Sequence, residues 1–419
     1  MAFHVGRRLD LQEEMSVSNV FDRCGGRLLP GLLLVVGFAV GAQCSERYPP
    51  FSWDRVPVCL HFGSPTRMTD EQIQRAARMS NLICLEKAHG RQTDPVHPER
   101  VAGEDARRLK RANPNARVLM YWNTLIAWPF TSYNRRFAET HPYDWILCDR
   151  KTGEPLLKVR RGNFKVFQYN LLKPEVRQWW AETIGNAVKE LGFDGIFMDA
   201  VLQAKRPVWL RRGWGLDKAD ELDAAVIDMM RRVRAIMGPD RLIIYNGFRT
   251  RRTADGKVSA DGVQFLPYAD GAMIEHFDGL SSTTKEETLR YWQMAAEAAR
   301  AGKIVVYKCW PDHNINWLNK EFMSKPDAEK EAIARRRIGY ALACYLIGAQ
   351  ENSYFCYGWG YNIADGQLID YPEYRHRLGP PKGDAIREPG TWIFRREFEH
   401  ARVVVDLEKR EGGIEWLED

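Results

Sequence analysis

Residues 192–200 read GFDGIFMDA, an apolar run that starts at a glycine and leads into the acidic residue Asp199. Short runs of the same kind, rich in Val, Ile, Leu, Phe or Tyr, recur along the chain after residue 55. Parallel strands that are covered on both faces have this composition. We therefore predict eight strands, at residues 58–61, 82–85, 118–122, 195–199, 242–246, 272–276, 304–308 and 354–357.

The segments between these runs have the features of amphipathic helices. Thr69 with Gln72, and Thr284 with Glu287, have the spacing of a capping box at a helix start. Eight strand–helix units over about 300 residues predict an α/β fold of the (β/α)8 barrel type. A dinucleotide-binding fold is disfavoured, because no Gly-x-Gly-x-x-Gly motif follows the first strand.

We place the barrel at residues 55–360, with a long loop over its mouth at residues 128–167. Residues 361–419 are predicted to form a C-terminal extension. Apolar and polar residues alternate over part of residues 391–406, which predicts a short β segment packed on the barrel.

The N-terminal residues have the features of a secretory signal peptide. Arg23 and Arg27 precede an apolar run at residues 28–40, which leads into a Val-Gly-Ala sequence ending at residue 42. We predict a signal peptide over residues 1–42, with Met15 as an alternative start. The run of about 13 residues is too short to span a bilayer, so we expect export to the periplasm or beyond without stable membrane insertion. A lipid anchor on Cys44 is the less favoured alternative.

Composition and charge exclude several classes of protein. The chain is 45% apolar and carries a net charge of +6, with short basic clusters separated by acidic residues, so we expect no nucleic-acid partner. Without a Cys-x-x-Cys or Cys/His cluster, we predict neither a metal site nor a cofactor. The cysteines of the apolar segments are predicted to be buried and free. They are Cys59, Cys84, Cys309, Cys344 and Cys356. The oligomeric state stays open.

Two acidic residues end predicted strands whose side chains can meet. Asp199 ends the fourth strand and Glu275 follows Ala272-Met273-Ile274 in the sixth. Inward residues of even-numbered barrel strands share layers, and active sites lie at the carboxyl ends of the strands. A carboxylate pair at that rim is what glycosidic cleavage requires. The alternative for each residue is a structural role, such as that expected for the turn residue Asp194.

Other polar and aromatic side chains at the strand ends are predicted to bind substrate. A sugar groove often offers aromatic faces, so we expect Trp122, Trp310 and Trp359 to line it. The full predicted set is His61, Glu86, Trp122, Asn123, Asn246, His276, Lys308, Trp310, Tyr357 and Trp359.

The motifs GFDGIFMDA and GAMIEHF resemble those of the glycoside hydrolase-like barrel family, over about residues 55–405. RVLMYWN, IIYNGF, IVVYKCWP and YFCYGWGY at other strand ends support the likeness. This family is similar in fold to the α-galactosidase clan and to endo-α-1,4-polygalactosaminidase barrels. In the α-galactosidase clan a nucleophilic Asp ends strand four and an acid/base carboxylate ends strand six. The resemblance implies that Asp199 is the nucleophile and Glu275 the acid/base, although the clan usually has Asp at the second position.

The predicted function is a retaining glycoside hydrolase that acts on an α-linked oligo- or polysaccharide. Two alternatives stay open: a carbohydrate-binding barrel without turnover, and an inverting polysaccharide hydrolase. Retention needs carboxyl groups about 5–5.5 Å apart and inversion needs about 6.5–9.5 Å. As the proton donor beside a second carboxylate, Glu275 is expected to have a pKa above the ordinary value of about 4.3.

Overall fold

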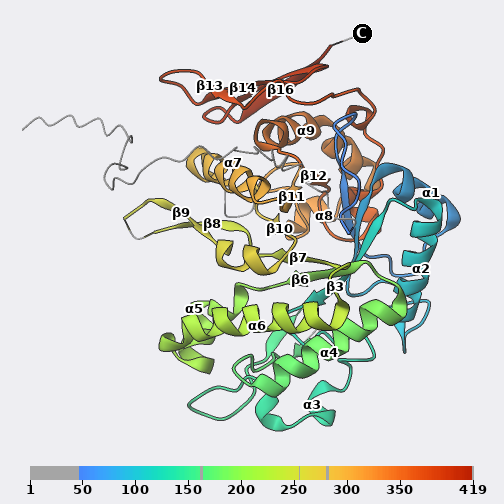
Figure 1. Cartoon of the computed structure of the whole chain (residues 1–419), viewed down its shortest axis with the longest axis vertical. Coiled ribbons are helices and arrows are strands. Elements are labelled where there is room, and N and C mark those ends of the chain that lie inside the picture. The colour runs from blue at the N-terminus through green and yellow to red at the C-terminus, as the bar shows by residue number, and fades with distance from the viewer. Residues whose placement is uncertain (1–46, 161–163, 254, 280–282, 418–419) are drawn as a thin grey trace, which may run out of the picture. The chain divides into compact units, whose positions relative to one another are not determined.

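The computed structural model describes residues 47–160, 164–253, 255–279 and 283–417 (Figure 1). The predicted signal peptide, Met15 and Cys44 lie outside the described residues. The described residues belong to one compact unit. Within the described part of the chain, no helix is long and apolar enough to cross a membrane.

Parallel strands form the centre of this unit, in the order β1-β2-β3-β6-β7-β10-β11-β12. Their bounds are β1 Cys59–Phe62, β2 Leu82–Leu85, β3 Arg117–Asn123, β6 Gly195–Asp199, β7 Leu242–Asn246, β10 Gly271–Ile274, β11 Ile304–Cys309 and β12 Ser353–Tyr357. The sheet closes where Val58 bridges Phe355 in parallel, with the Phe355 amide donating to the Pro57 carbonyl at 2.8 Å. This arrangement confirms the predicted eight-stranded barrel and each of its strands.

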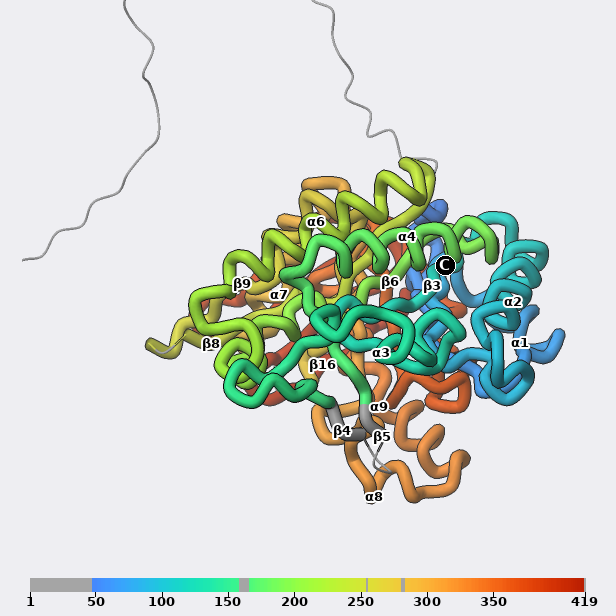
Figure 2. The backbone as a smooth tube through the Cα atoms, turned by 90° about the horizontal axis from the view of Figure 1, so that it is seen from below, coloured from blue at the N-terminus to red at the C-terminus, as the bar shows by residue number. Residues whose placement is uncertain are grey.

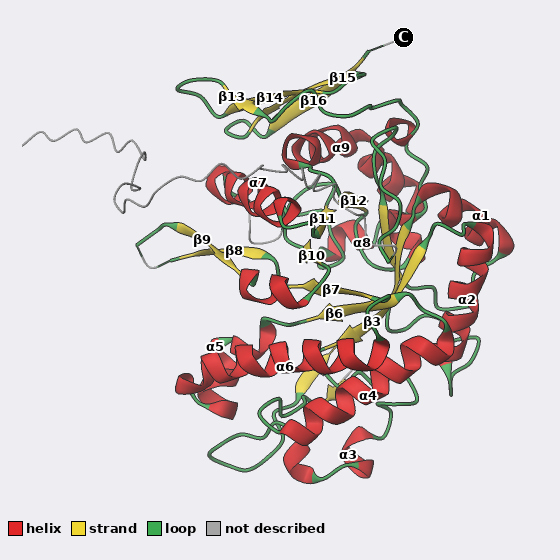
Figure 3. Ribbon diagram, viewed as in Figure 1, coloured by secondary structure: helices red, strands yellow, loops and turns green. Residues whose placement is uncertain are grey.

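Helices follow the strands and cover the outside of the barrel (Figure 3). The main helices are α1 Asp70–Met79, α2 Pro98–Ala112, α4 Pro174–Leu191, α6 Ala219–Met237, α7 Lys285–Arg300 and α9 Asp327–Gly348. Capping boxes open α1 at Thr69 and α7 at Thr284, as predicted. Helix α4 begins with Pro174 and ends at Gly192, whose φ of 79° suits the left-handed cap that glycine adopts most easily.

Shorter elements lie in the loops. The short α-helices are α3 Phe137–Thr140, α5 Pro207–Trp209 and α8 Lys320–Met323, and the paired strands are β4 Lys158–Arg160 with β5 Phe164–Val166 and β8 Arg249–Arg252 with β9 Val258–Asp261. The 3-10 and π turns are η1 Tyr143–Trp145, η2 Gln203–Lys205, η3 Leu210–Trp214, η4 Leu216–Lys218, η5 Val263–Tyr268, η6 Ile363–Gln367 and η7 Pro372–Tyr374. The segment with α3 lies beside α4 (Figure 2), where the ring of Phe137 contacts Trp179 at 5.0 Å.

A separate antiparallel sheet follows the barrel, in the order β13-β14-β15-β16. Its strands are β13 Ile386–Arg387, β14 Ile393–Glu397, β15 Ala401–Asp406 and β16 Glu411–Trp416. It packs on α9, where Arg396 Nη1 donates to the Leu346 carbonyl at 2.9 Å. The predicted β segment is thus one part of a larger sheet. Residues 411–416 escaped prediction because they hold two glycines and are largely exposed, so they lack an apolar alternation.

The remaining structural predictions concern turns and cysteines. Asp194 accepts a hydrogen bond from the Val118 amide at 2.9 Å and contacts Lys110 Nζ at 3.0 Å, so it has the structural role expected of it. The cysteines predicted as buried are free and buried in the structure.

Candidate active site

A cavity of about 1000 Å³ lies at the carboxyl ends of the barrel strands. Six of the predicted site residues line it: His61, Glu86, Asn123, Asp199, Asn246 and Glu275. The other lining residues are Gly63, Ser64, Pro65, Lys87, Ala88, Arg91, Gln92, Tyr121, Ile126, Trp128, Phe130, Phe197, Gln203, Trp317, Leu318, Tyr361, Asn362 and Asp365. The loop after β12 therefore brings residues from the predicted C-terminal extension into this cavity.

Asp199 is held by side chains from the neighbouring strands. The β3–β6 register places Asn123 opposite Asp199, and Asn123 Nδ2 donates to Asp199 Oδ2 at 2.9 Å. The Tyr121 hydroxyl donates to the same oxygen. Asn246 Nδ2, from the end of β7, donates to Asp199 Oδ1 at 3.0 Å. These donors fix both oxygens of the carboxylate and leave its position little freedom.

Glu275 follows β10 and receives its hydrogen bonds from β7 and from a loop. Asn246 Nδ2 donates to Glu275 Oε2 at 2.8 Å, and the Tyr361 hydroxyl donates to Oε1 at 2.9 Å. The indole Nε1 of Trp310 donates to the backbone carbonyl of Glu275 at 3.0 Å. His276 Nε2 lies 3.6 Å from Oε2. Side chain and backbone of Glu275 are thus both anchored.

One nitrogen atom connects the two carboxylates. Asn246 Nδ2 lies 3.0 Å from Asp199 Oδ1 and 2.8 Å from Glu275 Oε2. The distance between these two oxygens therefore cannot exceed 5.8 Å, the sum of the two hydrogen-bond lengths. The predicted meeting of Asp199 and Glu275 across the barrel mouth is present in the structure.

The charges of the pair differ from the expectation. Burial, and next the Glu275 carboxylate, raise the pKa of Asp199. Burial opposes ionisation of Glu275 too, but His276 and the hydrogen bonds from Asn246 and Tyr361 lower the pKa of Glu275 below its ordinary value. The predicted raised pKa of Glu275 is therefore wrong, because the donors around it stabilise the carboxylate.

The Arg249 charge also lowers the pKa of Glu275, and of all these influences only that of His276 changes with protonation near neutral pH. Burial lowers the pKa of His276, so its imidazole is largely neutral near pH 7 and then adds little attraction. The hydrogen bonds from Asn246 and Tyr361 do not depend on that charge.

A second charged group lines the cavity beside Asp199. Glu86 Oε2 contacts Lys87 Nζ at 2.5 Å, and Glu86 Oε1 lies 3.0 Å from His61 Nε2. Burial opposes the ionisation of Glu86, but Lys87 and His61 outweigh it and hold its pKa at about 2. Lys87 Nζ also lies 4.3 Å from the centre of the Tyr121 ring. Glu86 is therefore an ionised acceptor at the cavity wall.

Aromatic rings from loops form two further walls of the cavity. Trp128 and Phe130, in the loop after β3, stack with ring centres 5.4 Å apart and planes at 10°. Trp317, in the loop after β11, packs on Trp310 at 4.8 Å. Trp128 and Phe130, at the start of the predicted loop of residues 128–167, thus line the cavity, but the rings at the cavity differ from the predicted tryptophans.

Three predicted substrate contacts lie in the helix layer instead. Trp122 neighbours the inward-facing Tyr121 and Asn123, so alternation along β3 turns its ring outward, toward Tyr133 at 5.9 Å. The Tyr357 hydroxyl donates to the Ala334 carbonyl of α9 at 2.9 Å. Trp359 is buried against Phe322, with ring centres 6.0 Å apart. These placements correct the expectation that the three residues line the groove.

The other three predicted contacts lie behind the cavity wall. Lys308 is fully buried, and its Nζ donates to the Gly358 carbonyl at 2.7 Å and lies 3.7 Å from the centre of the Trp310 ring. Trp310 and His276 touch Glu275 without lining the cavity. Their placement indicates support of Glu275 rather than contact with a sugar.

Sequence reasoning missed the two tyrosines that hold the carboxylates. Tyr121 shares the parity of Asn123 on β3, so extending the strand-end analysis by two residues would have found it. Tyr361 comes four residues after the end of β12, in a loop where periodicity gives no signal.

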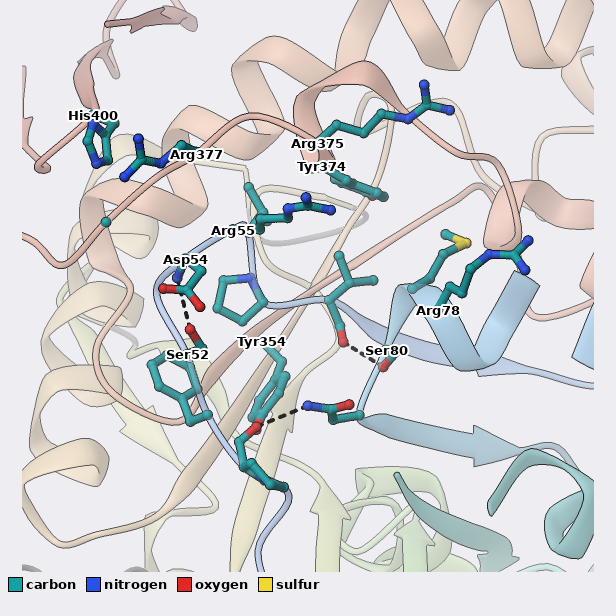
Figure 4. A pocket seen from close by; sticks show the side chains of 18 of the residues that line it. Ser52, Asp54, Arg55, Arg78, Ser80, Tyr354, Tyr374, Arg375, Arg377 and His400 are labelled. Atoms are coloured by element: carbon teal, nitrogen blue, oxygen red, sulfur yellow. Dashed lines mark hydrogen bonds between the residues drawn. The ribbon is translucent and has the colours of Figure 1, made fainter. Parts of the chain in front are cut away.

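A second cavity, of about 1050 Å³, lies at the opposite end of the barrel (Figure 4). It is lined near the starts of the strands, by Val58, Asn81 and Tyr354, and by arginines that include Arg55 and Arg377. The predicted site residues are absent from its lining. Among the described residues, no group of three His, Cys, Asp or Glu side chains could hold a metal ion.

Comparison with known proteins identifies the class and then the family. The barrel fold and the family match make this chain a glycoside hydrolase. It belongs to hypothetical glycosyl hydrolase family 15, whose family model matches residues 110–402. No curated protein sequence matches the chain.

Several solved structures are similar to this chain. The structure of Aspergillus fumigatus Ega3 in complex with galactosamine has 11% identity and a TM-score of 0.42, covering 77% of this chain and 97% of its own. The glycoside hydrolase domain of PelA from Pseudomonas aeruginosa has 12% identity and a TM-score of 0.44, covering 72% and 94%. The α-galactosidase TtGalA from Thermus thermophilus has 16% identity and a TM-score of 0.43, covering 87% and 68%.

Proposed function

We propose that this glycoside hydrolase cleaves an α-linked oligo- or polysaccharide with retention of configuration, with Asp199 as the nucleophile and Glu275 as the general acid and base. The single observation that carries the proposal is the shared hydrogen-bond donor Asn246. It brings one oxygen of each carboxylate within 5.8 Å of the other. The α-linkage rests on the resemblance of the two strand-end motifs to the α-galactosidase clan.

This spacing supports retention over inversion. An inverting enzyme must fit a water molecule between the sugar and its base, which takes about 6.5–9.5 Å between carboxyl groups. A retaining enzyme needs about 5–5.5 Å, because one carboxylate attacks the sugar directly. The upper limit of 5.8 Å that Asn246 sets lies close to the retaining range of about 5–5.5 Å and below the inverting range of about 6.5–9.5 Å.

Two steps follow from this arrangement. An oxygen of Asp199 bonds to the anomeric carbon while Glu275 gives its proton to the leaving glycosidic oxygen. Glu275 then takes a proton from water, whose oxygen displaces Asp199 from the anomeric carbon and restores the free enzyme. Each step inverts the anomeric carbon once, so the product keeps the configuration of the substrate.

In the first step Asp199 must be ionised and Glu275 must carry a proton, so the two carboxyl groups together hold one proton. The surroundings of the pair raise the pKa of Asp199 and lower that of Glu275, so the shared proton rests more readily on Asp199. The transition state of the first step reverses this preference. Positive charge developing at the anomeric carbon stabilises ionised Asp199, and the glycosidic oxygen gives the Glu275 proton an acceptor. Because the groups interact strongly, the pair titrates as a unit.

The test is the anomer that the enzyme releases first. Proton NMR during hydrolysis of an α-linked substrate should show the α-anomer before mutarotation. Early accumulation of the β-anomer would assign inversion and contradict the proposed roles. Wild-type protein without turnover on any chromogenic glycoside or polysaccharide would favour the carbohydrate-binding alternative.

The domain boundaries and the location of the enzyme are part of the same proposal. We propose that residues 1–42 are a signal peptide, that residues 55–360 are the catalytic barrel, and that the mature enzyme is exported to the periplasm or beyond. An external polysaccharide substrate would agree with this. N-terminal sequencing of the exported protein should begin near Gln43, and an intact residue 23–40 segment would contradict the prediction.

A further inference from the structure

The loop that carries Glu275 is held by a residue from the C-terminal sheet. Arg410 lies in the turn between β15 and β16, 132 residues after Asp278, which is the third residue after Glu275. Arg410 Nη1 donates to Asp278 Oδ1 at 2.8 Å, and Nη2 donates to Oδ2 at 3.0 Å. Nη1 also donates to the carbonyl oxygen of Thr283 at 2.9 Å. One guanidinium thus contacts two points of the segment after β10.

The geometry of this ion pair is specific. A planar guanidinium that faces both oxygens of a carboxylate fixes direction as well as distance. Asp278 has φ of 45° and Arg410 has φ of 55°, a left-handed conformation that such residues rarely adopt. A conformation of this kind persists where surrounding contacts hold it. The pair therefore differs from the exposed ion pairs elsewhere on the surface, whose contribution is small.

A short chain of contacts leads from Asp278 to Glu275. The neighbouring Gly279 lies against Trp310, since a Cβ at residue 279 would come within 2.4 Å of Trp310 Cδ1. The same indole donates through Nε1 to the Glu275 carbonyl at 3.0 Å. Trp310 also packs on Trp317, which lines the cavity. A shift of Asp278 would therefore move the indole that anchors Glu275.

Burial makes Asp278 dependent on its partner. Its side chain is 12% exposed, and burial raises its pKa to about 7 although the Arg410 charge lowers it. Asp312 also raises the pKa of Asp278, and Tyr340 and Cys344 of α9 are the nearby groups on the other side. If Arg410 were removed, the ionised carboxylate would be buried without a counter-charge, which is costly. The segment would then have to move or Asp278 would bind a proton.

We propose that Arg410 is a positioning residue for Glu275, so that the C-terminal sheet holds the acid/base in its reactive geometry through the Arg410–Asp278 ion pair. This inference rests on the proposed function of Glu275. It gives the sheet a part in turnover beyond its contribution to stability.

The main test compares two substitutions that each remove one ion pair of this turn. Lys285 Nζ on α7 contacts Glu408 Oε1 at 2.6 Å, so Lys285→Ala removes another ion pair of this turn without touching Asp278. Displacement of a reacting group by about 1 Å can cost roughly 100-fold in rate. We expect Arg410→Ala to lower kcat by about 10- to 100-fold with KM within about twofold, and Lys285→Ala to leave both within about twofold.

Further variants separate positioning from general damage. Arg410→Lys keeps the charge but loses the two-point contact, so its kcat should lie between those of wild type and Arg410→Ala. Asp278→Asn should also lower kcat, and combining it with Arg410→Ala should add little, because both remove one interaction. Equal losses in Arg410→Ala and Lys285→Ala, or wild-type kcat in Arg410→Ala, would overturn the inference. If Arg410→Ala does not fold, wild-type kcat in Asp278→Asn overturns it.

Glu275→Gln measured in parallel separates the two proposals. If Glu275→Gln keeps the wild-type rate on a substrate with a poor leaving group, the proposed function fails. If Glu275→Gln is inactive and Arg410→Ala keeps the wild-type rate, only the role of Arg410 fails.

Discussion

The two carboxylates of the cavity are held by different parts of the chain. Asp199 receives its hydrogen bonds from Tyr121 and Asn123 on β3 and from Asn246 at the end of β7. Glu275 shares Asn246, but its other anchors are Tyr361 and Trp310, which lie in the loop after β12 and directly after β11. Strand register thus fixes one carboxylate, whereas loop conformation fixes the other.

The difference suits the proposed roles. A nucleophile attacks from one direction, so a position set by the barrel register serves it well. An acid/base must give a proton to one oxygen and later take one from water, and here its placement depends on the contacts of loops with one another. The comparison also predicts which substitutions act on chemistry and which act on placement.

Asp199→Asn should have the largest effect. The amide keeps the size and accepts hydrogen bonds through its one oxygen, but it cannot act as the nucleophile. We expect kcat to fall by about three decades or more with the melting temperature nearly unchanged, as measured by steady-state kinetics and calorimetry. A variant with more than about a tenth of the wild-type rate would show that Asp199 is not the nucleophile.

Glu275→Gln should depend on the substrate. Without its proton, cleavage of a poor leaving group should fall by about 100- to 10,000-fold, while an activated aryl glycoside should be spared in the first step. Azide should partly restore turnover of the aryl glycoside by Glu275→Ala, because it attacks the glycosyl-enzyme without a base. Equal losses on both substrates and no azide effect would mean that Glu275 binds sugar instead.

Asn246→Ala removes the hydrogen-bond donor that Asp199 and Glu275 share. Its N–H groups stabilise the ionised carboxylates, and the hydrogen bond to Glu275 lowers that pKa. Without it, both pKa values of the pair should rise, so the acidic limb of kcat/KM should move to higher pH. We expect a fall in kcat of roughly 10- to 100-fold. A pH profile that does not move would show that Asn246 does not bridge the pair in solution.

Two tryptophans offer the mildest contrast between strand and loop. Trp122 lies on β3 but faces outward, so Trp122→Ala should destabilise the fold by about 3–5 kcal/mol with little change in KM. Trp317 lies on a loop and lines the cavity, so Trp317→Ala should raise KM by a few-fold with a small change in melting temperature. Kinetics and thermal melts of both variants test this contrast. If Trp122 lined the sugar groove instead, Trp122→Ala would raise KM more than it lowers the melting temperature.

The sequence predicts the barrel strands and the site residues at their ends well. The eight barrel strands carry compact apolar runs, and Asp199, Asn246 and Glu275 follow such runs directly, so their meeting at one rim follows from the fold. Trp122 was misplaced because position at a strand end was given more weight than alternation along the strand.

The site residues that lie on loops could not be predicted in the same way. Tyr361, Trp128 and Trp317 reach the cavity through loop conformations that no periodic pattern encodes. His276, Asn246 and Tyr361 together lower the pKa of Glu275, and the part that comes from Tyr361 has no signal in the sequence. Asp278 and Arg410 meet across 132 residues of chain, and nothing in their local sequence indicates a partner.

The seam between the first and last barrel strands links folding to the assembly of the site. The Gly63 amide, directly after β1, donates to the Tyr361 carbonyl at 2.8 Å, and the Ile363 amide donates to the Gly63 carbonyl at 2.8 Å. These contacts join segments about 300 residues apart, and such long-range pairings are slow to form because loop-closure entropy opposes them. They also hold the backbone of Tyr361, whose hydroxyl donates to Glu275. A partly folded chain in which the first and last strands are not yet paired would have most of its barrel, but Glu275 would lack its hydrogen bond from Tyr361. During refolding, activity should therefore return only when these two strands pair.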